Sequence, residues 1–393
     1  MRALGPLPRK NHSTIRAPIS KIHLMATIAL DATYTVGSQP SGVAIYCRRL
    51  IECLAEIECE HHYLLCYRLS RFKSRREFLR PNSMLGPRGP RFSVRYYQNP
   101  WTFWLPWQAD VFHSLVQRPP AFHFRKEIVT VIDLFPVTGK DYSTPEFQRK
   151  FSALLTEAVE RAVCIITPSQ YTTDQLLKYS SVPREKVRLI PFGVDLPTAS
   201  LNPERRVLER ERLVGKGNEM IFTVGVIQTR KNTMNAVKAL RHLPERYRLV
   251  IAGGNGHGSK AIHDFIRTEG LSSRVVLLGY APAEQLPILY DAASVFLFPS
   301  FEEGFGLPVL EAMAHGLPVV ASKTSSLPEV GGDAALYVDP YDPKDIAEKV
   351  LCAVEDDGQR RVMIERGLAR AKEFTWRRTA EANLQVYNEI LVL

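Results

Sequence analysis

The strongest constraint on the fold of this chain is a repeated alternation of short apolar stretches with helix-length segments. The apolar stretches are typical of buried strands and form two series, separated by a polar, highly charged segment at residues 195–219. Strands that alternate with helices predict parallel sheets with helices on both faces. The first series covers residues 22–30, 62–67, 92–97, 110–113, 128–131, 163–166 and 187–190, and the second covers residues 220–225, 247–254, 275–279, 295–300, 318–322 and 336–339.

The interruption divides the chain into two units of ordinary domain size. A chain of 393 residues is longer than one hydrophobic core normally serves, so two domains are expected from length alone. We place an N-terminal domain at residues 1–195 and a second domain at residues 196–375. Each is predicted to be a doubly wound α/β domain of Rossmann-like type, and the two are expected to face each other across a cleft. Residues 1–20 are expected to be loosely ordered.

Charge and cysteine content narrow the range of partners. The net charge of +10 favours an anionic partner: a phosphorylated small molecule, a nucleic acid or an anionic membrane. No apolar run reaches the ~18 residues of a transmembrane helix. The six cysteines form no C-x-x-C pair, and no cluster of His, Cys, Asp or Glu has metal-site spacing, so neither a disulfide framework nor a metal is predicted. A reducing, cytoplasmic setting is the simplest interpretation.

The segment FEEGFGLPVLE at residues 301–311 is the richest in chemistry. It follows a predicted strand and opens a helix, whose free N–H groups would make an anion site. Gly304 and Gly306 would let the backbone approach a ligand closely. Glu303 and Glu311 would lie at the same mouth, where carboxylates accept hydrogen bonds from sugar hydroxyls. The alternative is that Glu303 caps the helix and Glu311 is a solvated acid of its first turn.

A second segment, TVGVIQTRKN at residues 223–232, places two cations at the carboxyl end of a strand. After Gly225 the loop carries Arg230 and Lys231 side by side, where they could neutralise a diphosphate and stabilise it as a leaving group. An exposed basic turn is the alternative.

The glycine-rich segment IAGGNGHGSK at residues 251–260 fits neither the phosphate-loop spacing nor the dinucleotide spacing. It therefore supports neither a nucleotide triphosphatase nor a nicotinamide enzyme. A tight turn at Gly253, touching a ligand, is the interpretation that remains.

The N-terminal half offers weaker candidates. The turn that ends at Gly42 could approach phosphates from the other side of the cleft, although an ordinary turn explains it nearly as well. Asp133 and Ser169 also follow predicted strands and are candidate cleft residues. His113 ends a predicted strand and is expected to be hydrogen-bonded in place.

The segment at 303–311, with its continuation AMAHGLPVVAS at residues 312–322, resembles the E-x7-E signature of the family 4 retaining glycosyltransferases. Residues 225–232 resemble the glycine–Arg–Lys–Asn loop of the same family. The resemblance implies the GT-B fold: two Rossmann-like domains facing across a cleft, with a C-terminal helix, here residues 376–393, that crosses back to the first domain. It also implies a metal-independent hexosyltransferase that needs no cofactor beyond its nucleotide-sugar substrate.

Site roles follow from the resemblance residue by residue. Arg230 and Lys231 would hold the donor diphosphate, and Glu303 would bind hydroxyls of the donor sugar. Glu311 would bind the ribose, and the donor-binding set is completed by backbone groups of the loop and the two strand ends. That set comprises Gly225, Gly253, Gly304, Phe305, Gly306 and Leu307. One departure is Ile132, which stands where relatives commonly have a histidine near the donor sugar and which cannot donate a side-chain hydrogen bond.

The resemblance favours transfer of mannose from GDP-mannose to a hydroxyl of a lipid-linked or polysaccharide acceptor. A UDP-hexose-dependent glycosyltransferase is the alternative, and a noncatalytic sugar-nucleotide binding protein or an epimerase is a further one. The basic stretch at residues 68–95, followed by Trp101, Trp104 and Trp107, allows peripheral contact with an anionic membrane, against the alternative of a solvated loop with the tryptophans in the core. No nucleic-acid-binding pattern is present.

Overall fold

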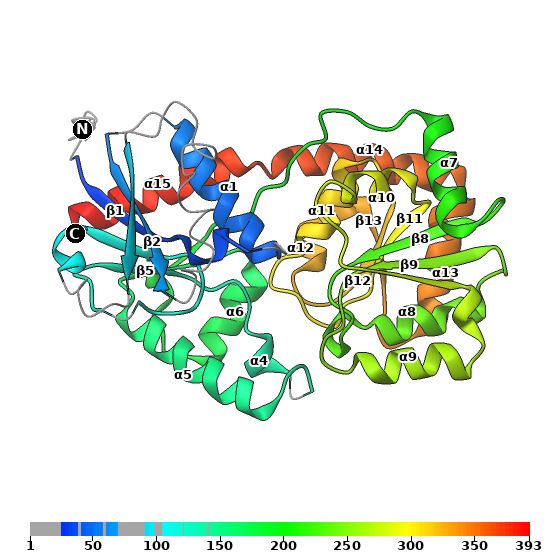
Figure 1. The fold of residues 1–393 in the computed structure, drawn as a ribbon, viewed down its shortest axis with the longest axis horizontal. Coiled ribbons are helices and arrows are strands. Elements are labelled where there is room, and N and C mark those ends of the chain that lie inside the picture. Colours follow the sequence, from blue (N-terminus) through cyan, green and yellow to red (C-terminus); the bar gives the residue numbers. More distant parts are fainter. Residues whose placement is uncertain are drawn as a thin grey trace, which may run out of the picture.

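The computed structural model of the protein describes residues 25–37, 41–57, 60–69, 91–97, 104–120, 122–139 and 141–393. They form two α/β lobes that lie side by side (Figure 1). Each lobe contains one parallel sheet with helices on both faces, as the alternation in the sequence predicts. The expectation for residues 1–20, and most of the basic stretch at 68–95, fall outside the described residues.

The sheet of the N-terminal lobe has the strand order β3-β2-β1-β4-β5-β6-β7, and all its neighbouring strands are parallel. The order reverses between β1 and β4, which is where doubly wound sheets bind ligands beyond the carboxyl ends of the strands. The strands are β1 (Thr27–Asp31), β2 (His62–Arg68), β3 (Phe92–Tyr97), β4 (Val111–Ser114), β5 (Glu127–Thr130), β6 (Cys164–Thr167) and β7 (Val187–Leu189). The helices of this lobe are α1 (Gly42–Glu56), α4 (Phe135–Thr138), α5 (Pro145–Arg161) and α6 (Gln170–Tyr179).

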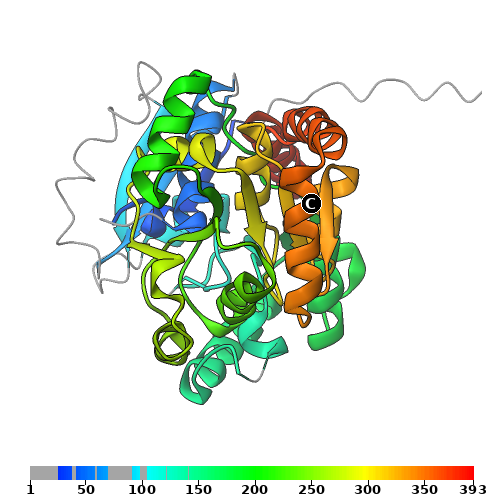
Figure 2. The same cartoon turned by 90° about the vertical axis from the view of Figure 1, so that its right-hand side faces the viewer.

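The sheet of the C-terminal lobe has the order β10-β9-β8-β11-β12-β13, again parallel throughout, with its reversal between β8 and β11. Its strands are β8 (Glu219–Val224), β9 (Tyr247–Ala252), β10 (Val275–Gly279), β11 (Val295–Phe298), β12 (Val319–Ser322) and β13 (Ala335–Val338). The helices are α7 (Pro203–Val214), α8 (Thr233–Ala239), α9 (Ser259–Thr268), α10 (Leu286–Ala292), α11 (Leu307–Ala314), α12 (Leu327–Gly331), α13 (Pro343–Glu355) and α14 (Asp357–Glu373). Figure 2, with this lobe in front, shows helices flanking the sheet.

Strand residues of the C-terminal lobe alternate between two cores, which is why these strands read as continuous apolar runs. In β8, Met220 and Phe222 pack in one cluster, whereas Ile221 between them packs in the other, with Val237 and Ile346 of α8 and α13. The first of these clusters continues into the N-terminal lobe. The two lobes are therefore joined by packed side chains as well as by the chain itself.

The chain crosses between the lobes twice, and the two crossings touch. Helix α15 (Trp376–Val392) leaves α14 and runs back onto the N-terminal lobe, where it packs against α1 (Figure 1). The N–H of Val194, on the first crossing, donates to the carbonyl of Phe374 on the second at 3.0 Å, and Val194 pairs with Thr375 in a parallel bridge. Gly193 lies so close beneath Trp376 that a Cβ there would meet its nitrogen at 2.2 Å. The returning helix predicted for residues 376–393 is confirmed.

A buried hydrogen-bond chain fixes that helix to the sheet. His113 on β4 contacts Tyr387 of α15 through Nδ1 at 2.7 Å and Thr130 of β5 through Nε2 at 2.9 Å. The Thr130 hydroxyl also contacts that of Tyr46 on α1 at 3.0 Å. Burial lowers the pKa of His113 to about 3, so this imidazole is neutral at physiological pH. His113 is thus hydrogen-bonded in place, as expected from the sequence.

No helix in the described part of the chain is both long enough and apolar enough to cross a bilayer.

Candidate active site

A cavity of about 370 Å³ lies between the lobes, beyond the carboxyl ends of β1 and β5 of one sheet and of β8, β9 and β11 of the other. The C-terminal lobe contributes most of its polar lining, and the N-terminal lobe contributes the loops after β1 and β5. Among the residues predicted from the sequence, those that line this cavity are Gly42, Asp133, Gly225, Arg230, Lys231, Gly253, Glu303, Gly304, Phe305, Gly306, Leu307 and Glu311.

The centre of the cavity is a charged cluster formed by the two sequence motifs. Glu303 Oε2 lies 3.0 Å from Arg230 Nη1, and its Oε1 lies 2.7 Å from Lys231 Nζ. The side chains of Glu303 and Arg230 are less than a tenth exposed. Arg230 also lies over the ring of Phe135, 4.5 Å from its centroid, so a cation of the C-terminal lobe contacts α4 of the other lobe.

The electrostatics of the cluster keep Glu303 ionised. Burial alone would raise the pKa of Glu303, but the positive charges of Arg230 and Lys231 outweigh burial and lower the pKa to about 2. Burial lowers the pKa of Lys231, while the neighbouring Glu303 acts in the opposite direction. Within this cluster two cations face one carboxylate, so the cluster itself carries a net positive charge that can attract an anion.

Two glycines bring the strand ends of β8 and β9 together beside the cations. A Cβ on Gly253 would lie 1.8 Å from the carbonyl oxygen of Gly225, so no other residue fits there without moving the backbone. Gly225 itself has φ of +131° and lies against the aliphatic part of Lys231. The tight turn predicted at Gly253 therefore abuts the loop that carries the cations.

Helix α11 begins at the cavity, and its second turn carries the second acid, Glu311. Gly306, with φ of +112°, precedes the helix. Pro308 has no N–H, and the Val309 N–H donates to the Gly306 carbonyl at 3.0 Å. The N–H groups left to face an anion are therefore those of Gly306 and Leu307. Glu311 Oε2 accepts a hydrogen bond from the hydroxyl of Tyr290 on α10 at 2.7 Å. Burial raises the pKa of Glu311. Its Oε1 has no partner among the described residues.

The N-terminus of helix α1, in the N-terminal lobe, lies against the N-terminus of α11. Ser41 caps α1, whose first residue is Gly42, and a Cβ on Gly42 would lie 3.8 Å from Leu307 Cδ1. The N-termini of α1 and α11 are therefore close neighbours at the cavity.

The loop after β5 places Asp133 against the loop of Glu303. A Cβ on Gly304 would lie 2.0 Å from the carbonyl oxygen of Ile132 and 2.8 Å from Asp133 Cβ, so only glycine allows this approach. Gln117 holds the same backbone: its Oε1 accepts from the Ile132 N–H at 3.2 Å, and its Nε2 donates to the Asp133 carbonyl at 3.5 Å. Ile132, which stands where the sequence resemblance implies a histidine, presents its backbone carbonyl to the other lobe.

Ser169 does not line the cavity, contrary to the prediction. It is fully buried as the N-cap of α6, because its hydroxyl is used at the contact between the lobes. Ser169 Oγ donates to the Gly304 carbonyl at 2.7 Å, and Thr172 Oγ1 donates to the same oxygen at 2.9 Å. These two hydroxyls bind the loop that carries Glu303 on the side that faces away from the cavity.

Two more contacts of this kind were not predicted from the sequence. Glu302 accepts a hydrogen bond from the Thr138 hydroxyl, and Glu329 accepts from the backbone N–H groups of Gln170 and Tyr171, at 2.7 and 3.3 Å for the shortest contact to each. Each pair is more than 150 residues apart in the sequence, so no local pattern could show them. Tyr290 was missed for a related reason, since a buried tyrosine in a helix is usually a core residue.

No group of three or more His, Cys, Asp or Glu side chains in the described ranges could hold a metal ion. The cations that the cavity presents are those of Arg230 and Lys231.

Two family models match the chain in succession. The model described as Glycosyltransferase Family 4 matches residues 40–197, and the model described as Glycosyl transferases group 1 matches residues 204–370.

Two kinds of relative share about the same identity with the chain. The O-antigen chain mannosyltransferase B of Escherichia coli is 31% identical over 291 residues, which are 72% of this chain and 76% of that protein. A D-inositol 3-phosphate glycosyltransferase of Corynebacterium jeikeium is 30% identical over 301 residues, 73% of this chain and 71% of that protein.

Solved structures of glycosyltransferases have the same fold. A sucrose-phosphate synthase from Thermosynechococcus elongatus superposes with a TM-score of 0.73 at 22% identity, over 93% of this chain and 99% of that one. HepE from Anabaena, solved with UDP and glucose, superposes with a TM-score of 0.72 at 18% identity, over 93% and 100% of the two chains. The GT-B fold expected from the sequence is thereby confirmed.

Proposed function

Because this chain belongs to glycosyltransferase family 4 and is a retaining glycosyltransferase, we propose that it transfers mannose from GDP-mannose to a hydroxyl of a lipid-linked or polysaccharide acceptor. The support for mannose is the similarity to the O-antigen chain mannosyltransferase B of Escherichia coli. A UDP-linked hexose is the alternative donor, and the similarity to an inositol phosphate glycosyltransferase keeps a phosphorylated polyol among the acceptors to be tried.

The observation that carries the proposal is the charged cluster of Glu303, Arg230 and Lys231 beside two helix N-termini. A diphosphate would take its charge balance from the two cations and from the N–H groups of α11. As the bond from sugar to phosphate breaks, negative charge grows on the leaving oxygen, and fixed cations in a buried site stabilise that charge strongly. No metal ion is needed for this step.

The two acids would then hold the sugars on either side of the diphosphate. Glu311 offers Oε1 to a ribose hydroxyl, since its Oε2 is already held by Tyr290. Glu303 stays ionised, and each of its oxygens has a further lone pair for a hydroxyl of the transferred sugar. In a retaining transfer the acceptor hydroxyl attacks from the face that the diphosphate leaves.

A thermal-shift screen with GDP-mannose, UDP-glucose and ADP-glucose tests the donor. A ligand at 100 times its Kd stabilises the folded state by about 2.7 kcal/mol, which is roughly a 5–11 °C rise in Tm for lobes of this size. GDP-mannose should give the largest rise, and Glu311→Gln should reduce it. Stabilisation by UDP-glucose alone would replace the donor by the alternative.

We also propose that the N-terminal lobe touches an anionic membrane surface near Trp104 and Trp107. Trp107 is 78% exposed and Trp104 37% exposed, and an exposed tryptophan suits the membrane interface. Arg68 adds no surface charge there, since it is buried against Asp31. Flotation with phosphatidylglycerol vesicles, but not with phosphatidylcholine vesicles, is expected for the wild type and should weaken in Trp107→Ser. Equal flotation with both lipids contradicts the proposal.

A further inference from the structure

We infer that Asp133 is the base that takes the proton from the acceptor hydroxyl. The inference rests on the proposed function, because it assumes that the cavity holds a sugar diphosphate. Among the described residues that line the cavity from the N-terminal lobe, the others are Ser41, Gly42 and the apolar Val43, Ile45, Ile132 and Phe192, so Asp133 is the one with an ionisable side chain. Among the described residues of the lobe that faces the acceptor, Asp133 is thus the one carboxylate in the cavity lining that can accept a proton.

The geometry places this carboxylate in the same cavity as Glu303 and the two cations that would hold the diphosphate. Asp133 packs directly on Gly304, the residue that follows Glu303. The charges of Arg230 and Lys231, which would hold the leaving diphosphate, act on it. In a retaining transfer the acceptor approaches on the side of the diphosphate. A carboxylate on the cavity wall beside Glu303 and the cations, as Asp133 is, can reach the proton of that acceptor.

The other acids of the cavity are committed elsewhere. Glu303 is paired with two cations, and its pKa of about 2 makes it a poor proton acceptor. Glu311, in the second turn of α11, is held by Tyr290 through Oε2, and the proposed function gives its Oε1 to the ribose of the donor. The side-chain carboxylate of Asp133 has neither a hydrogen-bond nor an ion-pair partner in the described ranges. Burial, with the charges of Glu303 and Glu302 added, raises its pKa to about 6 although Arg230 and Lys231 oppose the rise. A base is most effective when its pKa lies near the working pH.

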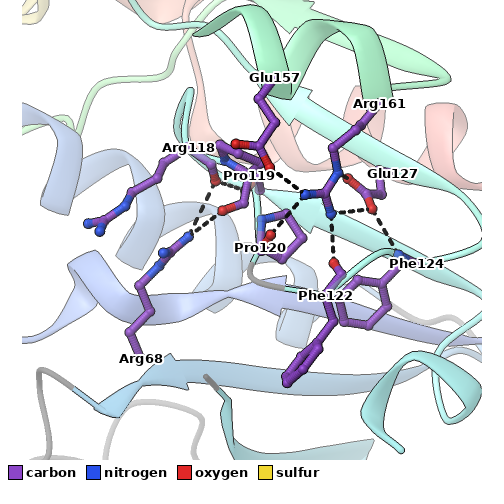
Figure 3. A network of polar contacts seen from close by, with 10 residues as sticks. Arg68, Arg118, Pro119, Pro120, Phe122, Phe124, Glu127, Glu157 and Arg161 are labelled. Atoms are coloured by element: carbon purple, nitrogen blue, oxygen red, sulfur yellow. Dashed lines mark hydrogen bonds and ion pairs between the residues drawn. The ribbon is translucent and has the colours of Figure 1, made fainter. Parts of the chain in front are cut away.

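The surrounding loop holds Asp133 at this point. Gln117 binds the backbone on both sides of it, and the loop that carries Gln117 is fastened by two arginines (Figure 3). Arg68 donates to the Pro119 carbonyl at 2.8 Å from one side. Arg161 donates to the carbonyls of Pro120 and Phe122 at 3.0 and 2.6 Å from the other. The carboxylate of Asp133, which has no partner among the described residues, is therefore attached to a backbone segment that is held in place, as a catalytic group requires.

The step balances without any other reactant. The acceptor O–H bond breaks and its proton passes to a carboxylate oxygen of Asp133, while the oxygen forms a bond to the anomeric carbon of the donor. The bond from that carbon to the diphosphate oxygen breaks, and its electron pair leaves with the diphosphate, beside Arg230 and Lys231. The proton on Asp133 then returns to solvent.

The test compares nucleophiles that carry a proton with one that does not. GDP release from GDP-mannose is measured for the wild type, Asp133→Asn and Asp133→Ala, with methyl α-D-mannopyranoside or with azide. Loss of a general base lowers turnover by about 10²–10⁴-fold. We expect a loss of at least about 100-fold with the mannoside. Azide has no proton to lose, so Asp133→Ala should form mannosyl azide at a rate within about tenfold of the wild type. The wild-type kcat/KM should rise with pH through a limb near pH 6 that is missing in both variants.

The control variant and the possible results separate a general base from a positioning role. Asp110→Asn, at the opposite end of β4, is the control for a carboxylate of the same lobe outside the cavity. Turnover of Asp133→Asn within about threefold of the wild type, or a pH limb that persists in it, overturns the inference. Loss with both nucleophiles shows a positioning role instead and also overturns it. If no variant and no wild type releases GDP, while thermal shift shows another donor bound, the proposed donor has failed, and the comparison is repeated with that donor.

Discussion

The two lobes have nearly the same architecture but contribute to the site in opposite ways. The C-terminal lobe supplies charged side chains from two short segments at strand ends, whereas the N-terminal lobe supplies a helix N-terminus, backbone and one carboxylate. The buried arginines of the N-terminal lobe hold its own loops, as Arg161 does, while Arg230 of the other lobe faces the cavity. The C-terminal lobe also has a buried arginine with a structural role, since Arg274 donates to the carbonyls of Leu243 and Pro244. The ligand-facing role therefore belongs to Arg230 alone among these arginines.

The largest effect is expected for Lys231→Ala. The change removes one of two cations at the leaving group and leaves Glu303 with only Arg230, so kcat should fall about 10³-fold. Steady-state GDP release measures this. Lys323→Ala removes an exposed lysine of the same lobe and should leave kcat unchanged. Equal effects of the two changes would mean that the cluster has no role in turnover.

Arg161→Ala tests the opposite assignment in the N-terminal lobe. Arg161 pairs with buried Glu127 at 2.7 Å and satisfies two loop carbonyls, so its removal leaves a buried carboxylate and should lower the free energy of unfolding by about 3–5 kcal/mol. Urea unfolding gives the value, with Arg149→Ala on the same helix as the exposed control. If Arg161→Ala lowered the free energy of donor binding by more than the free energy of unfolding, the assignment of Arg161 to stability would be contradicted.

Asp133 should lower the stability of the N-terminal lobe in a pH-dependent manner. Its pKa is raised from 3.8 to about 6 on folding, so the folded state resists an ionisation that the unfolded chain accepts. The cost is absent below about pH 4, grows between pH 4 and 6 and reaches about 3 kcal/mol above pH 6. Asp133→Asn should therefore raise Tm at pH 7.5 but not at pH 4, as calorimetry can show. A Tm gain of the same size at both pH values would contradict this assignment.

Tyr290→Phe should give the smallest effect. It removes only the hydroxyl that orients Glu311, so the KM for the donor should rise about fivefold, equivalent to about 1 kcal/mol, with kcat unchanged. Tyr247→Phe removes a similar bond to Glu355 away from the cavity and is the matched control. A fall in kcat rather than a rise in KM would place Tyr290 in the chemical step.

The contrast between the lobes also decides what the sequence could predict. Glycines and charges within a dozen residues of two strand ends identify the donor half of the site, because strand, turn and helix start follow one another in the chain. The strand at 275–279 was predicted with the bounds of β10. In the N-terminal lobe, Thr138, Thr172 and Gln117 are ordinary polar residues whose role comes from contacts with distant segments. The contacts of Thr138 and Thr172 appear only when the lobes are placed together, and those of Gln117 appear only once the N-terminal lobe has folded.

The paired crossings at Val194 and Phe374 have a mechanical consequence. A single flexible linker would let one lobe rotate relative to the other about any axis. Two chain segments that are hydrogen-bonded side by side restrict the relative motion of the lobes mainly to rotation about one axis.

The returning helix α15 has a second consequence, which concerns protein engineering. If the gene were cut after residue 195, the second product would still carry the helix that completes the first lobe, so the halves should refold only when both are present.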